Sequence, residues 1–188
     1  MPVTQANQVA AAKRLENVRY AIRDLACVAD EVIQQGHKVL PLNVGDPLNF
    51  DFQTPPHIIE AAYKAMRDGK NGYAPSPGIP EALEAIRAEA ARKGIAVQDV
   101  FVTSGVSETV DLCISALVNP GEDILTPKPD YPLYSAVLCK LGIALNAYDL
   151  NEDDAWQPEL ADIERKLTPR TRAIVLINPN NPTGSLCS

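Results

Sequence analysis

The stretch that decides the fold lies near the C-terminus, where the apolar run Ala173-Ile174-Val175-Leu176-Ile177 leads into Asn178-Pro179-Asn180-Asn181-Pro182-Thr183-Gly184. A β-branched apolar run that ends at Asn-Pro is typical of a buried strand followed by a loop. Each proline disfavours the α region for the residue before it, which keeps the loop extended. The pattern predicts polar side chains at the carboxyl end of a strand, where open α/β sheets bind ligands. An ordinary strand-exit loop has the same composition, so the stretch alone leaves both interpretations open.

The sequence upstream of this stretch alternates strands with helices. Strands are predicted at residues 100–103, 123–126, 143–150 and 173–177, and helices at 106–118, 131–141 and 158–167. This order predicts an α/β fold whose largely parallel sheet is covered by helices. Earlier in the chain, apolar spacing predicts helices at 18–35, 55–67 and 80–93 and a short extended segment at 39–44. Thr54 is the candidate cap of the second of these helices.

The composition narrows the class of protein. A chain of 188 residues with 46% hydrophobic residues is long enough for one domain with a real core. The net charge of -7 and the pI near 4.8 argue against nucleic acid or an anionic membrane as a partner, because both require a basic face. No apolar run is long enough to span a bilayer, and residues 1–12 do not resemble a secretory signal. We therefore expect a cytoplasmic protein.

Cysteine and histidine spacing gives no sign of a metal site. The four cysteines are far apart, and no Cys/His spacing typical of zinc occurs. Cys27, Cys113 and Cys139 fall in apolar helical patterns, so we expect them to be buried and reduced. His37 and His57 are expected at the surface.

A glycine turn joins a predicted strand to a predicted helix in Thr103-Ser104-Gly105-Val106-Ser107. Free backbone N–H groups at a helix N-terminus can bind an anion, and the Ser107 hydroxyl adds a possible donor. The turn is not GxGxxG and lacks the lysine of a P-loop, so it fits nucleotides poorly. A turn that serves packing alone has the same sequence features.

Three further residues have both a structural and a functional interpretation. Tyr131 lies at the next strand–helix junction, where its ring can stack on a flat heteroaromatic ring or anchor the helix start. Tyr73 lies in a loop rich in glycine and proline, where it can cover the core or reach a ligand. Gly45 offers a backbone N–H that no side chain shields, or simply makes a turn.

Together these motifs resemble the pyridoxal-phosphate (PLP) aminotransferases of classes I and II. The resemblance runs in order through Asn43-Val44-Gly45-Asp46-Pro47, Gly72-Tyr73, residues 103–108, Asp130-Tyr131-Pro132 and the Asn-rich loop. It covers the chain from about residue 18 to the end. It is strongest to the glutamate–pyruvate (alanine) branch, through residues 129–134 and 167–172.

The resemblance implies a fold, an activity and an assembly. The fold is the three-layer, mostly parallel α/β sheet of the major PLP-aminotransferase fold, incomplete at its C-terminal side. Residues 1–70 would be an N-terminal arm and first helices, part of a small domain, and residues 71–188 the N-terminal portion of the large PLP-binding domain. The complete enzyme would be a homodimer that transfers an amino group between an L-amino acid, alanine or glutamate, and a 2-oxo acid.

The resemblance also assigns cofactor contacts. Val106 and Ser107 would hold the PLP phosphate through their amides and the Ser107 hydroxyl. Tyr131 would cover the pyridine ring, and Asn181 would hydrogen-bond the phenolic oxygen. Tyr73 would reach across the dimer interface to the cofactor phosphate of the other subunit.

Gly45 and Asn181 would lie at the substrate carboxylate, but the catalytic residues themselves are not assigned. In the resembled family the Schiff-base lysine, the acid on the pyridinium nitrogen and the arginine for the substrate follow the Asn-Pro-Thr-Gly loop, which places them beyond Ser188. The lysines present do not match that position: Lys13, Lys38, Lys64, Lys70, Lys93, Lys128, Lys140 and Lys166. The alternative is thus a truncated, catalytically inactive aminotransferase fragment. A nucleotide-binding Rossmann-like domain is a weaker third hypothesis, because it requires GxGxxG and an acid at the next strand end.

Overall fold

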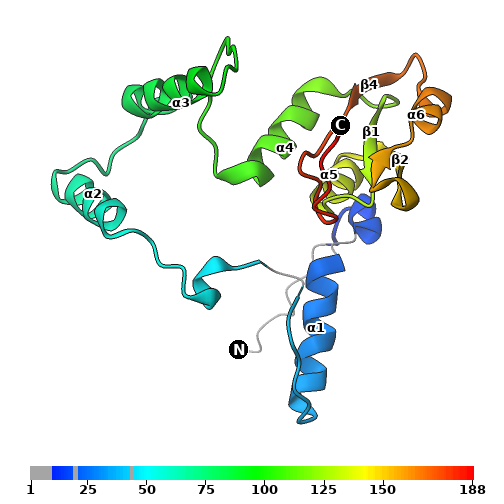
Figure 1. Ribbon diagram of the computed structural model, residues 1–188, viewed down its shortest axis with the longest axis horizontal. Helices are drawn as coiled ribbons and strands as arrows, with labels where there is room; N and C mark the ends of the chain where they lie inside the picture. The colour runs from blue at the N-terminus through cyan, green and yellow to red at the C-terminus, as the bar shows by residue number, and fades with distance from the viewer. Residues whose placement is uncertain (1–9, 19–20, 43–44) are drawn as a thin grey trace, which may run out of the picture. The chain divides into compact units, whose positions relative to one another are not determined.

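The computed structural model describes residues 10–18, 21–42 and 45–188, and Figure 1 shows its helices and strands in chain order. The chain divides into two compact units. The first comprises Met1–Val39 and Gly105–Ser188, and the second comprises Leu40–Ser104. The domain boundary near residue 70 stays a prediction.

A four-stranded sheet in the order β3-β2-β1-β4 forms the centre of the first unit. Strand β1 (Asp123–Lys128) pairs in parallel with β2 (Ala144–Asn151) on one side and β4 (Thr171–Ile174) on the other. The two-residue β3 (Gln157–Pro158), which follows the short helix η3 (Glu152–Asp154), is antiparallel to β2. The predicted α/β class and mostly parallel sheet are confirmed.

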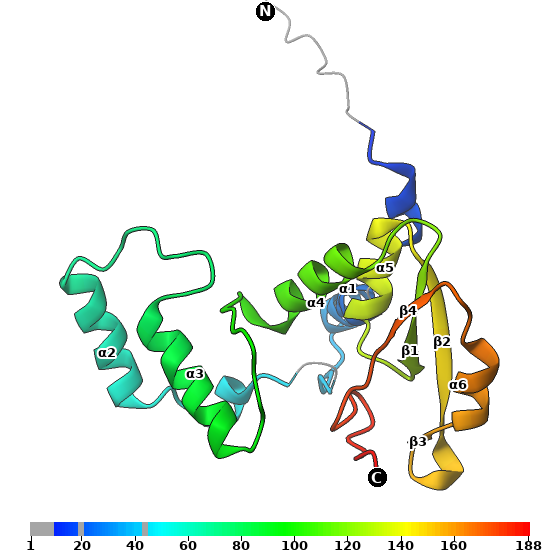
Figure 2. The same cartoon turned by 90° about the horizontal axis from the view of Figure 1, so that it is seen from above.

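Helices cover both faces of this sheet, which gives three layers (Figure 2). The helices are α4 (Gly105–Leu117), α5 (Leu133–Leu141) and α6 (Leu160–Lys166). Successive side chains of a strand point to opposite faces. Ile124 accordingly joins the core with α4 and α5, whereas Leu125 joins Tyr148 on the face against which Ile163 of α6 packs.

The buried carboxylate of Asp162 on α6 accepts a hydrogen bond from the backbone of β2. Asp162 is only 7% exposed, and its Oδ2 accepts hydrogen bonds from the Lys166 ammonium at 2.6 Å and from the backbone N–H of Asp149 at 2.9 Å. The Lys166 hydrogen bond, with the Asp149 N–H next in importance, lowers the pKa of Asp162 below its ordinary value.

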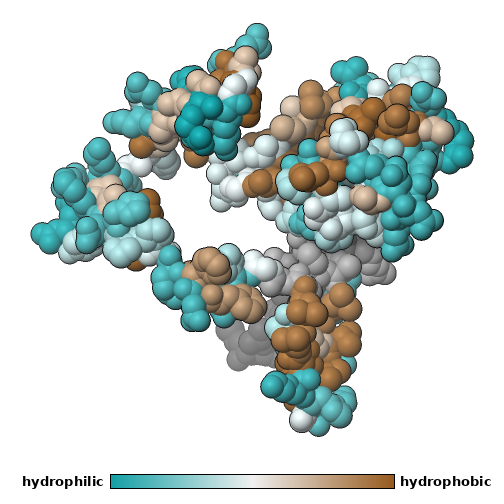
Figure 3. Space-filling model, in the orientation of Figure 1, coloured by the Kyte–Doolittle hydropathy of each residue, from teal (hydrophilic) through white to brown (hydrophobic). Residues whose placement is uncertain are grey.

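The N-terminal part of the first unit contains η1 (Lys13–Asn17) and α1 (Ala21–Gln34). The short helix lies against α5, where the Cys139 thiol donates to the Arg14 carbonyl oxygen at 3.7 Å. Helix α1 confirms most of the helix predicted at 18–35, of which residues 19–20 lie outside the described residues. Apolar side chains gather over α1 (Figure 3), where Leu25 and Val28 are more than half exposed.

The second unit contains η2 (Pro47–Phe50), α2 (Pro56–Arg67) and α3 (Pro80–Arg92), and its two α-helices were predicted. The predicted N-cap of α2 is wrong. Pro55, and not Thr54, is the N-cap residue, and it makes no side-chain hydrogen bond. Asp46 instead caps η2 by accepting from the Leu48 N–H at 3.1 Å.

The predicted strands depart from the structure in three places. Residues 100–103 form no strand with the described part of the chain; the Val102 N–H donates to the loop carbonyl of Pro77 at 2.7 Å instead. The described part of 39–44, residues 39–42, is likewise outside any strand. An extended segment becomes a strand only where its backbone finds a sheet partner. The last strand begins at Thr171 and ends at Ile174, although Val175 still donates its N–H to Leu125 O at 2.8 Å.

Candidate cofactor site

The first turn of α4 carries the predicted anion site. Gly105 begins the helix with φ of 79°, a left-handed conformation that glycine adopts without strain. N–H groups in a first turn have no acceptor within the helix and form the positive end of its dipole. Val106 and Ser107 are exposed there. Glu108 is the acidic residue of this first turn.

The second predicted element is the exit of β1. Asp130 and Tyr131 are half-buried between the strand and α5, and burial raises the pKa of the Asp130 carboxyl. Burial raises the pKa of Tyr134, the second residue of α5, and Cys113 and Asp130 raise it to a smaller extent. The junction between β1 and α5 is thus partly shielded from water, and an aromatic side chain lies beside it.

The third element is the loop after β4. Asn181 is exposed, whereas its neighbour Asn180 is 6% exposed. The Asn180 side-chain amide donates to Thr183 Oγ1 at 2.9 Å. The Asn178 carbonyl Oδ1 accepts from the Cys187 N–H at 3.1 Å. We singled out Asn181 from the sequence and missed Asn180; the Asn-rich loop was the available signal, but spacing does not say which of two adjacent asparagines faces inward.

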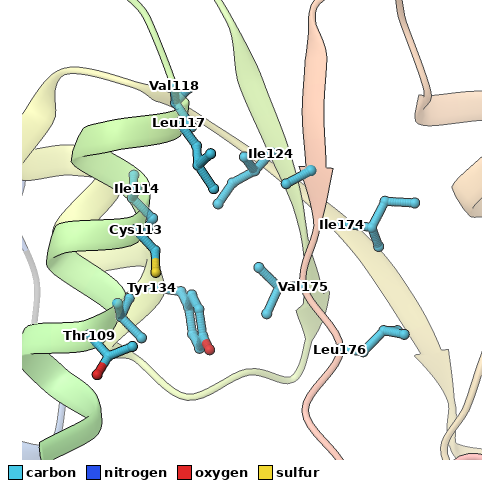
Figure 4. Close-up of a pocket in the computed structure, with 12 residues that line it drawn as sticks. Thr109, Cys113, Ile114, Leu117, Val118, Ile124, Tyr134, Ile174, Val175 and Leu176 are labelled. Carbon is cyan, nitrogen blue, oxygen red and sulfur yellow. The ribbon is translucent and has the colours of Figure 1, made fainter. Parts of the chain in front are cut away.

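These three elements lie at one end of the sheet. β1 and β4 are parallel, so their carboxyl ends share an edge. Figure 4 shows Thr109, near the start of α4, at the same end as Leu176, just past β4, with Leu117 and Val118 at the opposite end. The structure thus brings the elements that carry Ser107, Tyr131 and Asn181 to one edge; their roles stay predictions.

An apolar cavity of the first unit is a feature separate from these three elements. It has a volume of about 310 Å³ and lies between α4 and β4 (Figure 4). Its wall is mainly apolar, and of the described residues that line it none belongs to the predicted cofactor contacts. Residues of α4 and β4 line this groove, and within the described chain β4 pairs only with β1.

Cysteine burial was predicted wrongly at two positions. Cys113 on α4 is exposed and lines the groove, and Cys27 on α1 is also exposed, while Cys139 is half-buried.

Gly45 and Tyr73 belong to the second unit, so their roles also stay predictions. Tyr73 is fully exposed, and a Cβ added at Gly45 would meet no atom within 4 Å. Asn43 and Val44 of the same motif lie outside the described residues.

The described residues hold neither a candidate metal site nor a membrane-spanning helix. They contain no group of three or more His, Cys, Asp or Glu side chains that could hold a metal ion. Among them there is also no helix of the length and apolar character needed to cross a membrane.

The chemistry of the described side chains fits PLP. Helix-start donors and a hydroxyl suit a phosphate, a tyrosine suits an aromatic ring, and an exposed amide suits a phenolic oxygen. The elements that carry them lie at the carboxyl edge of a parallel sheet, where α/β proteins bind such ligands.

Comparison with known proteins shows the family to which the chain belongs. The family model described as "Aminotransferase class I and II" matches residues 37–188, and the chain belongs to this family.

Several of the relatives that the chain resembles are named as alanine or glutamate-pyruvate aminotransferases. The chain is 39% identical over 179 residues to glutamate-pyruvate aminotransferase AlaA of Escherichia coli, with 93% of this chain and 44% of that protein covered. Among solved structures, alanine aminotransferase from Pyrococcus furiosus matches with a TM-score of 0.89 at 45% identity, covering 95% of this chain and 46% of that one. An aspartate aminotransferase of Thermus thermophilus matches with a TM-score of 0.86 at 30% identity, covering 96% and 48%. The chain therefore spans about half the length of the relatives that it matches.

Proposed function

We propose that the whole protein binds PLP and transfers an amino group between an L-amino acid and a 2-oxo acid. Family membership supports the reaction class. The names of the relatives, glutamate-pyruvate aminotransferase and alanine aminotransferase, support alanine and glutamate as the amino acids. The observation that supports the proposal is that the start of α4, the exit of β1 and the loop after β4 lie at one edge of a parallel sheet.

Each side chain has a proposed task. The amides of Val106 and Ser107 and the Ser107 hydroxyl hold the phosphate, which anchors the cofactor at the start of α4. Tyr131 lies on the face of the ring and excludes water from it. Asn181 donates to the phenolic oxygen and stabilises its negative charge. When bound, PLP supplies an electron sink for the charge that develops at the substrate Cα.

Substrate contacts and assembly are part of the same proposal. Gly45 and Asn181 hold the substrate carboxylate through a backbone N–H and an amide N–H. The protein works in the cytoplasm as a homodimer, with Tyr73 of one subunit on the cofactor phosphate of the other. The large PLP-binding domain begins near residue 71.

A second candidate is an inactive protein that keeps this half of the fold without the Schiff-base lysine. The observation behind this candidate is that the lysines of this sequence do not match the position of the family's Schiff-base lysine.

Turnover of the whole protein, expressed from its complete gene with PLP, decides between the two. With alanine and 2-oxoglutarate, we expect pyruvate formation that a coupled lactate dehydrogenase assay follows through NADH absorbance. Aspartate and tyrosine as amino donors test the substrate assignment. A whole protein that neither retains PLP after gel filtration nor turns over any of these amino acids would reject the aminotransferase proposal.

A further inference from the structure

Asn180 is a buried polar residue next to the exposed Asn181. It lies in a tight niche together with Tyr148 and Trp156 and is 6% exposed. Its Oδ1 has no hydrogen-bond partner among the residues that the structure describes.

Asn180 takes part in the hydrogen bonds that close the Asn-rich loop around Asn181. The Asn180 N–H donates to Ser185 O at 2.8 Å, and the Gly184 N–H donates to Asn180 O at 2.7 Å. The Asn180 amide donates to Thr183 Oγ1 at 2.9 Å, and Thr183 Oγ1 in turn accepts from the Ser185 N–H at 3.3 Å. Asn181 and Pro182 form the exposed tip of this closed loop.

Packing alone does not explain an asparagine at position 180. A buried carbonyl oxygen without a donor costs stability, and an apolar side chain of similar size avoids that cost. The bond that the amide does make is directed at the loop itself, through Thr183. The benefit of this side chain therefore lies in the shape of the loop.

From this we infer that Asn180 is a positioning residue, which together with Thr183 holds the loop so that Asn181 is presented at the carboxyl edge of the sheet. The inference rests on the proposed function for the role of Asn181, but the loop geometry is a property of this chain without cofactor. Its test therefore has one measurement that needs no cofactor and one that does.

The test compares Asn180→Leu with the unchanged chain in the whole protein. We expect backbone amide exchange at Gly184, followed by NMR, to become at least tenfold faster, because the loop opens more often. The thermal midpoint should stay the same or rise, since leucine fills the niche without an unpaired oxygen. PLP affinity should fall about tenfold.

Two further variants keep the result interpretable. Thr183→Val removes the hydroxyl partner at a half-buried position; it should raise Gly184 exchange in the same way, and it decides the question if Asn180→Leu does not fold. Asn146→Leu is the matched control. The Asn146 amide donates to Asp123 Oδ1 and Lys166 O, each at 3.3 Å, away from the loop, so this variant should leave Gly184 exchange unchanged.

The outcomes separate the two ideas. Unchanged Gly184 exchange in Asn180→Leu, or in Thr183→Val where the first does not fold, overturns the inference. So does a drop in thermal midpoint without faster exchange, because that describes a packing residue. Faster exchange in a protein whose unchanged form retains no PLP supports the loop inference and rejects the proposed function.

Discussion

Tyr148 on β2 donates its phenolic hydroxyl to the backbone carbonyl oxygen of Val175, just past β4, at 2.8 Å. β1 lies between those two strands, so the bond spans the sheet and reaches the segment that leads into the Asn-rich loop. Tyr148 is 1% exposed and shares its niche with Asn180. The exit of β4 is therefore fixed by a side chain from a strand that is not its neighbour.

The first prediction concerns Tyr148 at high pH. Burial, with a smaller effect of Cys187, raises the pKa of Tyr148 to about 12, against about 10 in the unfolded chain. The native state keeps a proton that the unfolded chain loses, so stability falls as pH rises between these values, by roughly 1.4 kcal/mol per unit. Tyr148→Phe should lack this part of the alkaline loss and be about 1 kcal/mol less stable at neutral pH. Urea unfolding across that range measures both effects; identical alkaline slopes would contradict the prediction.

The second prediction concerns Asp162 at low pH. Its pKa is lowered, first by the Lys166 hydrogen bond and then by the Asp149 N–H. Its stabilisation is therefore present above the unfolded pKa of about 3.9 and is lost as pH falls below that value towards the folded pKa. Asp162→Asn should unfold at a lower urea concentration at neutral pH, and the difference should shrink in acid. Glu164→Gln, at an exposed position of the same helix, is the control and should change little.

Sequence patterns located most elements of the first unit because those elements bury apolar residues. β1 and β2 coincide closely with the predicted strands. Their apolar runs include the buried residues Ile124, Leu125 and Tyr148, and periodicity detects such runs. The same apolar pattern predicted a strand wrongly at residues 100–103. These residues form an apolar run but pair with no strand among the described residues. Apolar character predicts an extended segment, whereas strand pairing depends on distant parts of the chain.

The candidate site was predictable in part for a related reason. The motifs placed Ser107, Tyr131 and Asn181 after a helix start and two strand exits, and parallel topology brings such places together. Asn180 and the Tyr148–Val175 bond were not predictable. Both depend on which side chain turns inward, and the bond joins residues far apart in sequence.

The third prediction is that the 188-residue chain alone has no transaminase activity. None of its lysines matches the family's catalytic position, so none is expected to react with the cofactor aldehyde in the way that transfer requires. The assay uses alanine, 2-oxoglutarate and added PLP, with the Escherichia coli relative as a positive control. Turnover above the protein-free blank that borohydride abolishes by trapping one of these lysines would contradict this expectation.

The fourth prediction separates two asparagines of the loop in the whole enzyme. Asn181 is exposed at the tip and is proposed to donate to a charged oxygen, an interaction of about 1.5–3 kcal/mol. Asn178 accepts from the Cys187 N–H and so has a local structural bond. Asn181→Ala should therefore shift the pH titration of the bound cofactor's absorbance much more than Asn178→Ala does. Equal and negligible shifts in the two variants would remove Asn181 from the cofactor site.

The last prediction concerns the phosphate end of the site. Gly105 gives the backbone its left-handed turn, and the helix that begins there directs its first N–H groups away from the helix body. The proposed site holds the phosphate through individual hydrogen-bond donors, one of which is the Ser107 hydroxyl. Loss of one hydrogen bond to a charged group costs on the order of 1–2 kcal/mol, so Ser107→Ala should weaken PLP retention by roughly tenfold in the whole protein.

Ser115→Ala is the matched control for this variant, because Ser115 is an exposed serine near the opposite end of α4. It should retain PLP as the unchanged protein does. Fluorescence titration with PLP, and with pyridoxal, which has no phosphate, completes the measurement. Ser107→Ala should lose affinity for PLP only, because the hydroxyl is assigned to the phosphate and not to the ring. An equal loss for both ligands would place Ser107 elsewhere in the site, and no loss for either would remove it from the site.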